Sequence, residues 1–152
     1  RDRFARIGWV PPTLNARLGE IVRASFPEGT WIATGQIGQI GFYGERPIVD
    51  TVGLADHTIA RKGVSLDYIL ARDPAVLILL GSPYLLDAPN VGIDSGLVGL
   101  DEFRKRYRWT RVYQSDPPTE TCYWIERREK PLNEAPREPD QYEKIIVRLG
   151  NQ

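Results

Sequence analysis

The sequence predicts an α/β fold, a three-layer sandwich with a mostly parallel central sheet and an antiparallel edge. Three short apolar runs predict the strands: "TWIATG" (30–35), "RPIVDTVG" (46–53) and "AVLILLG" (75–81). Segments with helical spacing separate them, and strands alternating with helices are typical of this fold class. At 152 residues the chain has the length of one domain, so we expect a single soluble domain over residues 1–152.

The elements of the first half follow in order. Apolar residues at helical spacing predict a helix that begins near Thr13 or Asn15 and ends before Pro27. About a dozen residues then join the strand at 30–35 to the strand at 46–53, which leaves room for a tight crossover with one or two helical turns.

The second half continues the alternation. Segment 63–74 carries its apolar residues on one helical face, and run 75–81 is apolar throughout, as expected of a central parallel strand covered on both faces. A Pro-, Gly- and Asp-rich loop follows, and long loops of this kind are usually functional or mobile. After a short charged helix, residues 109–114 and 122–129 are predicted to pair at one sheet edge. Segment 142–150 is either a last strand or a tail.

Composition and glycine spacing exclude several function classes. Twenty basic and twenty acidic residues balance, which argues against a nucleic-acid partner. Gly35, Gly38 and Gly41 form GxxGxxG rather than the dinucleotide pattern GxGxxG, and no phosphate-loop lysine follows. We therefore expect no nucleotide cofactor, and we interpret these glycines as a sharp turn and close helix contacts. Cys122 is the only cysteine and is interpreted as a small buried hydrophobe.

The polar candidates cluster after the second predicted strand. Asp50, Asp56 and His57 could serve a small α/β hydrolase acting at the carboxyl ends of its strands, with a local cap at the turn as the alternative for His57. A zinc site is not expected, because one histidine cannot make the usual ligand pair. Asp50 lies inside an apolar run, so we predict that it is buried and held by backbone N–H groups or by Arg46 or Arg61.

The same region resembles a known family, the soluble C-terminal domains of bacterial multi-span GT-C glycosyltransferases, of the mannosyl- and arabinofuranosyltransferase type. In those proteins a Gly-Xaa-Ile-Gly turn, a tyrosine, Gly-Xaa-Arg-Pro, an aspartate in the next strand, a Gly-Leu-Xaa-Asp turn and a later Pro-apolar strand follow one another. The matching residues here are Gly35 to Gly38, Tyr43, Arg46 and Pro47, Asp50, Gly53 to Asp56, and Asp73 to Leu80.

The resemblance implies an accessory domain on the extracytoplasmic (periplasmic) side of a membrane glycosyltransferase that uses a lipid-linked sugar donor. Its partners would be the transmembrane part of the same parent protein and a glycan acceptor. The family's catalytic acids lie between membrane helices, so no catalytic residue and no metal site is carried over. Tyr43, Tyr84 and Trp109 are the sugar-facing candidates, with core or edge packing as the alternative. The absence of methionine fits a piece of a longer protein.

Overall fold

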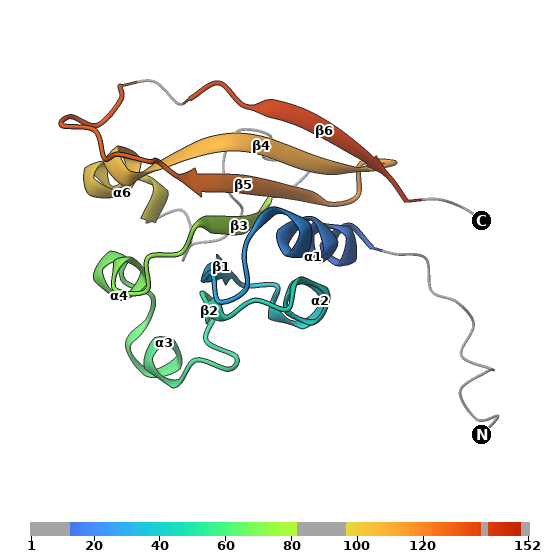
Figure 1. Cartoon of the computed structure of the whole chain (residues 1–152), viewed down its shortest axis with the longest axis horizontal. Coiled ribbons are helices and arrows are strands. Elements are labelled where there is room, and N and C mark those ends of the chain that lie inside the picture. Colours follow the sequence, from blue (N-terminus) through green and yellow to red (C-terminus); the bar gives the residue numbers. More distant parts are fainter. Residues whose placement is uncertain (1–12, 82–96, 138–139, 150–152) are drawn as a thin grey trace.

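A computed structural model describes residues 13–81, 97–137 and 140–149. In the described residues one mixed sheet has the strand order β2-β1-β3-β5-β4-β6 (Figure 1). Its strands are β1 (Ile32–Thr34), β2 (Ile48–Asp50), β3 (Val76–Gly81), β4 (Tyr107–Asp116), β5 (Thr121–Arg127) and β6 (Glu143–Arg148). The helices are α1 (Leu14–Ser25), α2 (Ile37–Gly44), α3 (His57–Lys62), α4 (Leu66–Leu70) and α6 (Asp101–Arg106).

The three apolar runs form the parallel part of the sheet, as predicted. β1 lies between β2 and β3 and pairs with both in parallel, with Thr34 opposite Asp50 on one side and Ile32 opposite Val76 on the other. The crossover from β1 to β2 contains α2, which has the one to two turns that the short connection allows. The prediction of an α/β fold with these three adjacent strands is confirmed.

The antiparallel part is the hairpin of β4 and β5, which joins the sheet through β5 and β3. Segment 142–150 contains a strand rather than only a tail, because β6 pairs in parallel with β4. The hairpin was expected at the sheet edge, but β6 covers its outer side. The sheet edges in the described chain are therefore β2 and β6.

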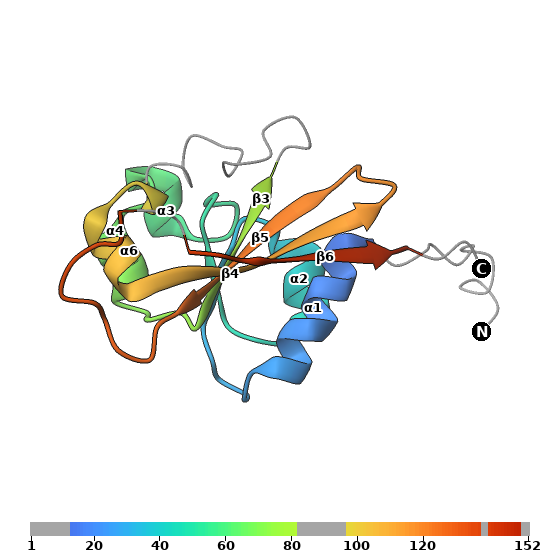
Figure 2. The ribbon, with the colours of Figure 1, turned by 90° about the horizontal axis from the view of Figure 1, so that it is seen from above.

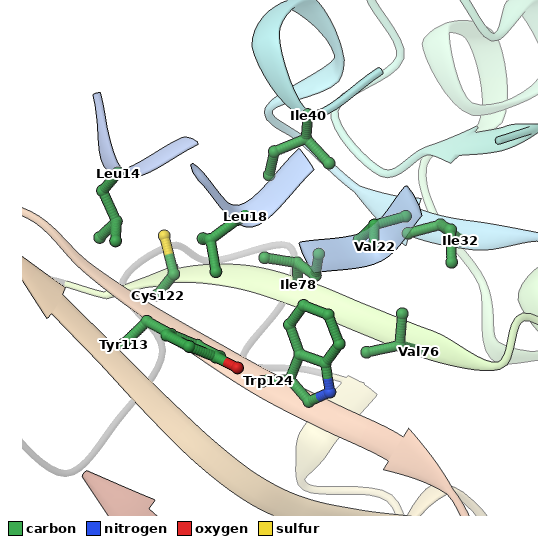
Figure 3. Close-up of a cluster of buried hydrophobic side chains, with 10 residues drawn as sticks. All are labelled: Leu14, Leu18, Val22, Ile32, Ile40, Val76, Ile78, Tyr113, Cys122 and Trp124. Atoms are coloured by element: carbon green, nitrogen blue, oxygen red, sulfur yellow. The ribbon is translucent and has the colours of Figure 1, made fainter. Parts of the chain in front are cut away.

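Two hydrophobic clusters, one on each face of the sheet, make the three layers. Alternation along β1 sends Ile32 into the cluster beneath α1 and α2, and Ala33 into the cluster beneath α3, α4 and α6. Figure 2 shows α1 and α2 grouped apart from the other three helices. The first cluster contains Leu18 of α1 and Trp124 of β5 and is drawn in Figure 3.

The helices on the second face differ from the prediction. α4 covers only five residues of segment 63–74. α3 was not predicted at all. It is six residues long and begins because the Asp56 side chain accepts hydrogen bonds from the first free amides, which is the usual way a short helix is started.

Candidate functional site

The carboxyl ends of β1, β2 and β3 lie together at one end of the parallel strands, where ligands bind in most α/β sheets. The chain leaves β1 towards α2 on one face, whereas after β3 the next described helices pack on the other face. Strands β1 and β3 are neighbours, and the described helices that follow them lie on opposite faces of the sheet. The position between their carboxyl ends is the topological switch point, where such sheets bind ligands. Two of the predicted site residues lie at this same end: Asp50 is the last residue of β2, and Asp56 precedes α3 in the chain that follows.

Asp50 ends β2 and is 3% exposed. One carboxylate oxygen accepts hydrogen bonds from the backbone N–H groups of Val52 (3.1 Å) and Gly53 (3.0 Å), and the other accepts one from Ala55 (2.6 Å). The predicted burial and backbone partners are confirmed. The carboxylate supplies the acceptors for three backbone N–H groups of the loop that leaves the sheet, and this role is structural.

Neither of the predicted arginines, Arg46 and Arg61, shares that task. Arg46 instead donates through Nε (3.0 Å) and one terminal nitrogen (2.7 Å) to the carbonyl oxygen of Phe26, and to the carbonyl oxygen of Arg23 at 2.9 Å. These are the carbonyls at the end of α1, so Arg46 closes a helix C-terminus. Arg61 lies exposed on α3.

Glycines let the Asp50 loop lie close to its neighbours. Gly53 has φ of 83°, and a Cβ on it would lie 2.7 Å from the backbone nitrogen of Ala60 in α3. A Cβ on Gly35 would lie 2.5 Å from Val52 Cγ2. Gly38, by contrast, has nothing within 4 Å of such an atom. The interpretation of the glycines as close-contact positions therefore holds for Gly35 and not for Gly38.

Asp56 is the N-cap of α3 and joins it to α4. One oxygen accepts from the amides of Thr58 (2.9 Å) and Ile59 (3.2 Å), and the other accepts from the Tyr68 hydroxyl at 2.7 Å. Burial alone would raise the pKa of the Asp56 carboxyl, but the hydrogen bond from Tyr68 and those from the two amides outweigh it and lower that pKa.

His57 is the first residue of α3 and its side chain is exposed. It does not cap the helix at this turn, because Asp56 supplies the cap. Both nearby carboxylates are occupied by hydrogen bonds from the chain itself, Asp50 with three backbone amides and Asp56 with two amides and a hydroxyl. These hydrogen bonds hold a loop and a helix in place.

The predicted sugar-facing aromatics do not share one surface. Tyr43 is 40% exposed on α2 and meets the 75% exposed Phe42 edge to face, at 5.1 Å between ring centroids. Trp109 packs against the cluster on the opposite face of the sheet, edge-on to Tyr123 at 4.8 Å. Tyr84 lies outside the described residues.

Cys122 lies in the cluster beneath α1, as predicted, and is 1% exposed (Figure 3). Burial raises the pKa of its thiol to about 12, so it is protonated and unreactive at neutral pH. Within the described ranges no group of three or more His, Cys, Asp and Glu residues could hold a metal ion.

Sequence reasoning missed a second polar region, which lies at the amino ends of the parallel strands. A cavity of about 410 Å³ there is lined by residues from the segment before β3, from the end of α6 and from the end of β5 and the chain after it. Residues 127–131 supply four of its six lining residues, but Asp73 and Arg106 come from distant parts of the chain, so the sequence does not indicate that they meet. Its lining residues are Asp73, Arg106, Arg127, Arg128, Glu129 and Pro131.

Comparison with known proteins adds a family assignment. No curated protein and no solved structure shows a significant match. Among the described helices, none has the length and apolar character needed to cross a membrane. One family model, described as a domain of unknown function (DUF8728), matches residues 7–136, which is most of the sequence. The chain belongs to this family, DUF8728.

Proposed function

We propose that the chain is an accessory extracytoplasmic domain of a membrane-embedded glycosyltransferase that uses a lipid-linked sugar donor. In this role it helps to position the glycan acceptor and contacts the transmembrane part of the same polypeptide, while the chemistry takes place elsewhere. The proposal starts from the family resemblance of residues 32–61 and 70–80.

One observation carries the accessory role: Asp50 and Asp56, the aspartates after the glycine turn in the resembling segment, are occupied by hydrogen bonds within the fold. Asp50 binds three backbone amides and Asp56 binds two amides and the Tyr68 hydroxyl. A general base needs a carboxylate within reach of a substrate proton. Residues that hold a loop and cap a helix are what a non-catalytic domain requires.

The exposed aromatic pair on α2 supports a binding task. Phe42 is 75% exposed and Tyr43 is 40% exposed, and their rings contact each other edge to face. Aromatic rings with one apolar face and, for tyrosine, a hydroxyl at the edge suit stacking on sugar rings. This pair is therefore the surface that we assign to the acceptor.

The test uses membranes that contain the full-length parent polypeptide, supplied with a polyprenyl-phosphate sugar and a glycan acceptor. Replacing both Phe42 and Tyr43 with Ser should raise KM for the acceptor about tenfold, the loss of one to two kcal/mol of stacking, with little change in kcat. Leu132→Ser, at another exposed apolar side chain (41%), is the matched control and should leave KM unchanged.

Two results would contradict the proposal. The first is a coding sequence upstream of Arg1 that contains no membrane spans. The second is sugar transfer by the 152-residue chain alone. Hydrolysis of small esters by that chain, abolished by His57→Ala, would instead favour the small α/β hydrolase.

A further inference from the structure

The cavity at the amino-terminal edge of the parallel strands, which we call the arginine pocket, is lined by Asp73, Arg106, Arg127, Arg128, Glu129 and Pro131. It has a volume of about 410 Å³, within the range of small-molecule sites. Its lining carries three guanidinium groups and two carboxylates, and two further carboxylates, those of Glu102 and Asp140, pair with Arg106 and Arg128. It lies at the opposite end of the parallel strands from the Asp50 loop and shares no residue with the site described above.

Two of the three arginines are held from one side only. Arg127, on β5, donates to the backbone carbonyl of Asp73 at 2.9 Å and forms an ion pair with its carboxylate through the same nitrogen. Arg106, at the end of α6, pairs through Nε with Glu102 at 3.1 Å. Each side chain is thereby oriented while part of its guanidinium group stays available.

Arg128 is the most buried of the three, with 12% of its side chain exposed. It donates to Asp140 at 2.7 Å and to the carbonyl of Arg104 at 3.3 Å, and its backbone N–H donates to the carbonyl of Arg106 at 2.7 Å. The last bond fixes two of the pocket arginines relative to each other. The positive groups are therefore preorganised before any ligand arrives.

Donor nitrogens remain unused in the part of the chain that the structure describes. Both terminal nitrogens of Arg106, Nε and one terminal nitrogen of Arg127, and one terminal nitrogen of Arg128 make no hydrogen bond there. Guanidinium groups favour oxyanions, which they bind through charge-assisted and often bidentate hydrogen bonds. Three such groups offer more donors than the two oxygens of a carboxylate can accept.

We propose that the arginine pocket binds a phosphate group. A phosphate has more acceptor oxygens than a carboxylate and a charge of up to minus two, so it can engage several guanidinium groups at once. This inference does not depend on the proposed function, because it requires neither a membrane partner nor sugar transfer.

The surroundings indicate what carries the phosphate. A second cavity of about 400 Å³ adjoins the first at Arg127 and is lined also by Phe26, Pro27 and Ala75, together with Thr30 and Glu126. The carboxylates of the two cavities are acceptors for hydroxyl groups, and the apolar side chains suit the face of a ring. The ligand class is a phosphorylated sugar, either free or at the head of a lipid.

Calorimetric titration of the 152-residue chain tests the proposal, with inorganic phosphate and a hexose 1-phosphate added at constant ionic strength. Vesicles of phosphatidic acid, compared with phosphatidylcholine, test a lipid-borne phosphate. We expect binding that Arg106→Gln and Arg127→Gln each weaken about tenfold or more, the loss of one or two charge-assisted hydrogen bonds. Binding to soluble phosphates assigns a free ligand, and binding to the anionic vesicles alone assigns a headgroup.

The control is Arg61→Gln, which removes the same charge from an exposed position on α3. If this variant weakens binding as much as Arg106→Gln, the attraction is non-specific and the proposal is wrong. The proposal is equally wrong if none of the probes binds. Because Arg127 also contacts Asp73, thermal melting of each variant accompanies the titration, and Arg106→Gln decides between the outcomes if Arg127→Gln unfolds.

Discussion

The two ends of the parallel strands handle charge in opposite ways. At the carboxyl end, Asp50 is turned into the fold and bonded to backbone amides. At the amino end, Arg106 and Arg127 are partly exposed and bonded through one side of each guanidinium group, so that donor nitrogens are left over. Both ends of the strands are polar, but the Asp50 carboxylate is bonded to the chain itself, whereas Arg106 and Arg127 keep donor nitrogens that make no hydrogen bond within the described residues.

This difference distinguishes charged side chains that hold the fold together from charged side chains that remain able to bind a ligand. A buried carboxylate bonded to backbone amides cannot exchange partners without unfolding its loop, whereas an exposed ion pair exchanges partners at little cost. The carboxylates of Asp50 and Asp56, at the position that most α/β proteins use for ligands, are thus bonded within the fold, whereas the arginines at the opposite end keep donors for the proposed phosphate. Stability measurements on variants at the two ends test this view.

The largest effect is expected for Asp50→Ala. Three backbone amides lose their acceptor in a buried loop, so the free energy of unfolding should fall by about 1–3 kcal/mol, measured by chemical denaturation. The variant Asp50→Asn keeps one acceptor oxygen and should lose less. An Asp50→Ala protein that melts at the wild-type temperature would contradict the structural role and would reopen a catalytic one.

Gly53→Ala should act on the same loop. Its positive φ and the backbone of Ala60 at 2.7 Å leave no room for a Cβ, so we expect a loss of about 1–2 kcal/mol. Gly38→Ala is the matched control, since it adds a methyl group in open space within α2. It should be neutral or stabilise by up to about 1 kcal/mol. Equal losses in both variants would show that the tight contact of the loop with α3 is unimportant.

The role of Asp50 at the carboxyl ends of the strands could be predicted from the sequence, whereas the arginine pocket at the amino ends could not. A carboxylate within an apolar run has to be buried and satisfied, which correctly indicated Asp50 and its backbone partners. α3 was missed because its six residues place only Ile59 in the core, too few to show a helical period. The only sequence signal for this helix is Asp56, a residue type that commonly caps the start of a helix.

The arginine pocket could not be inferred, because the order of strands in the sheet creates it. Asp73 precedes β3, while Arg106 and Arg127 lie next to β4 and on β5. β5 pairs with both β3 and β4, and this arrangement brings together residues more than fifty positions apart. Apolar runs predicted the strands, the adjacency of β1, β2 and β3 and the pairing of β4 with β5, but no residue pattern indicated that β5 would pair with β3.

A smaller, pH-dependent effect is expected for Tyr68→Phe. The variant loses the hydroxyl that donates to Asp56, which should cost about 1 kcal/mol at neutral pH. The pKa of Asp56 is lowered in the folded state, so its contribution is present above the unfolded pKa of about 3.9 and is lost as the pH falls through the folded value. Denaturation curves of both proteins should therefore converge in acid. A constant difference from pH 7 to pH 3 would indicate lost packing instead.

The smallest effect is expected at the amino edge. Arg127→Gln breaks an ion pair whose side chains are 41% and 64% exposed, and exposed pairs contribute at most about 1 kcal/mol, so the free energy of unfolding should change by less than that. Asp73→Asn, which removes the other partner, should change it as little, and the double variant should show little coupling between the two. Added salt should shrink even this difference, because exposed charges are screened. If Arg127→Gln destabilises the chain as much as Asp50→Ala does, the arginines are as structural as the buried carboxylate. The contrast between the edges would then fail, and a loss of phosphate binding in that variant would have to be assigned to unfolding.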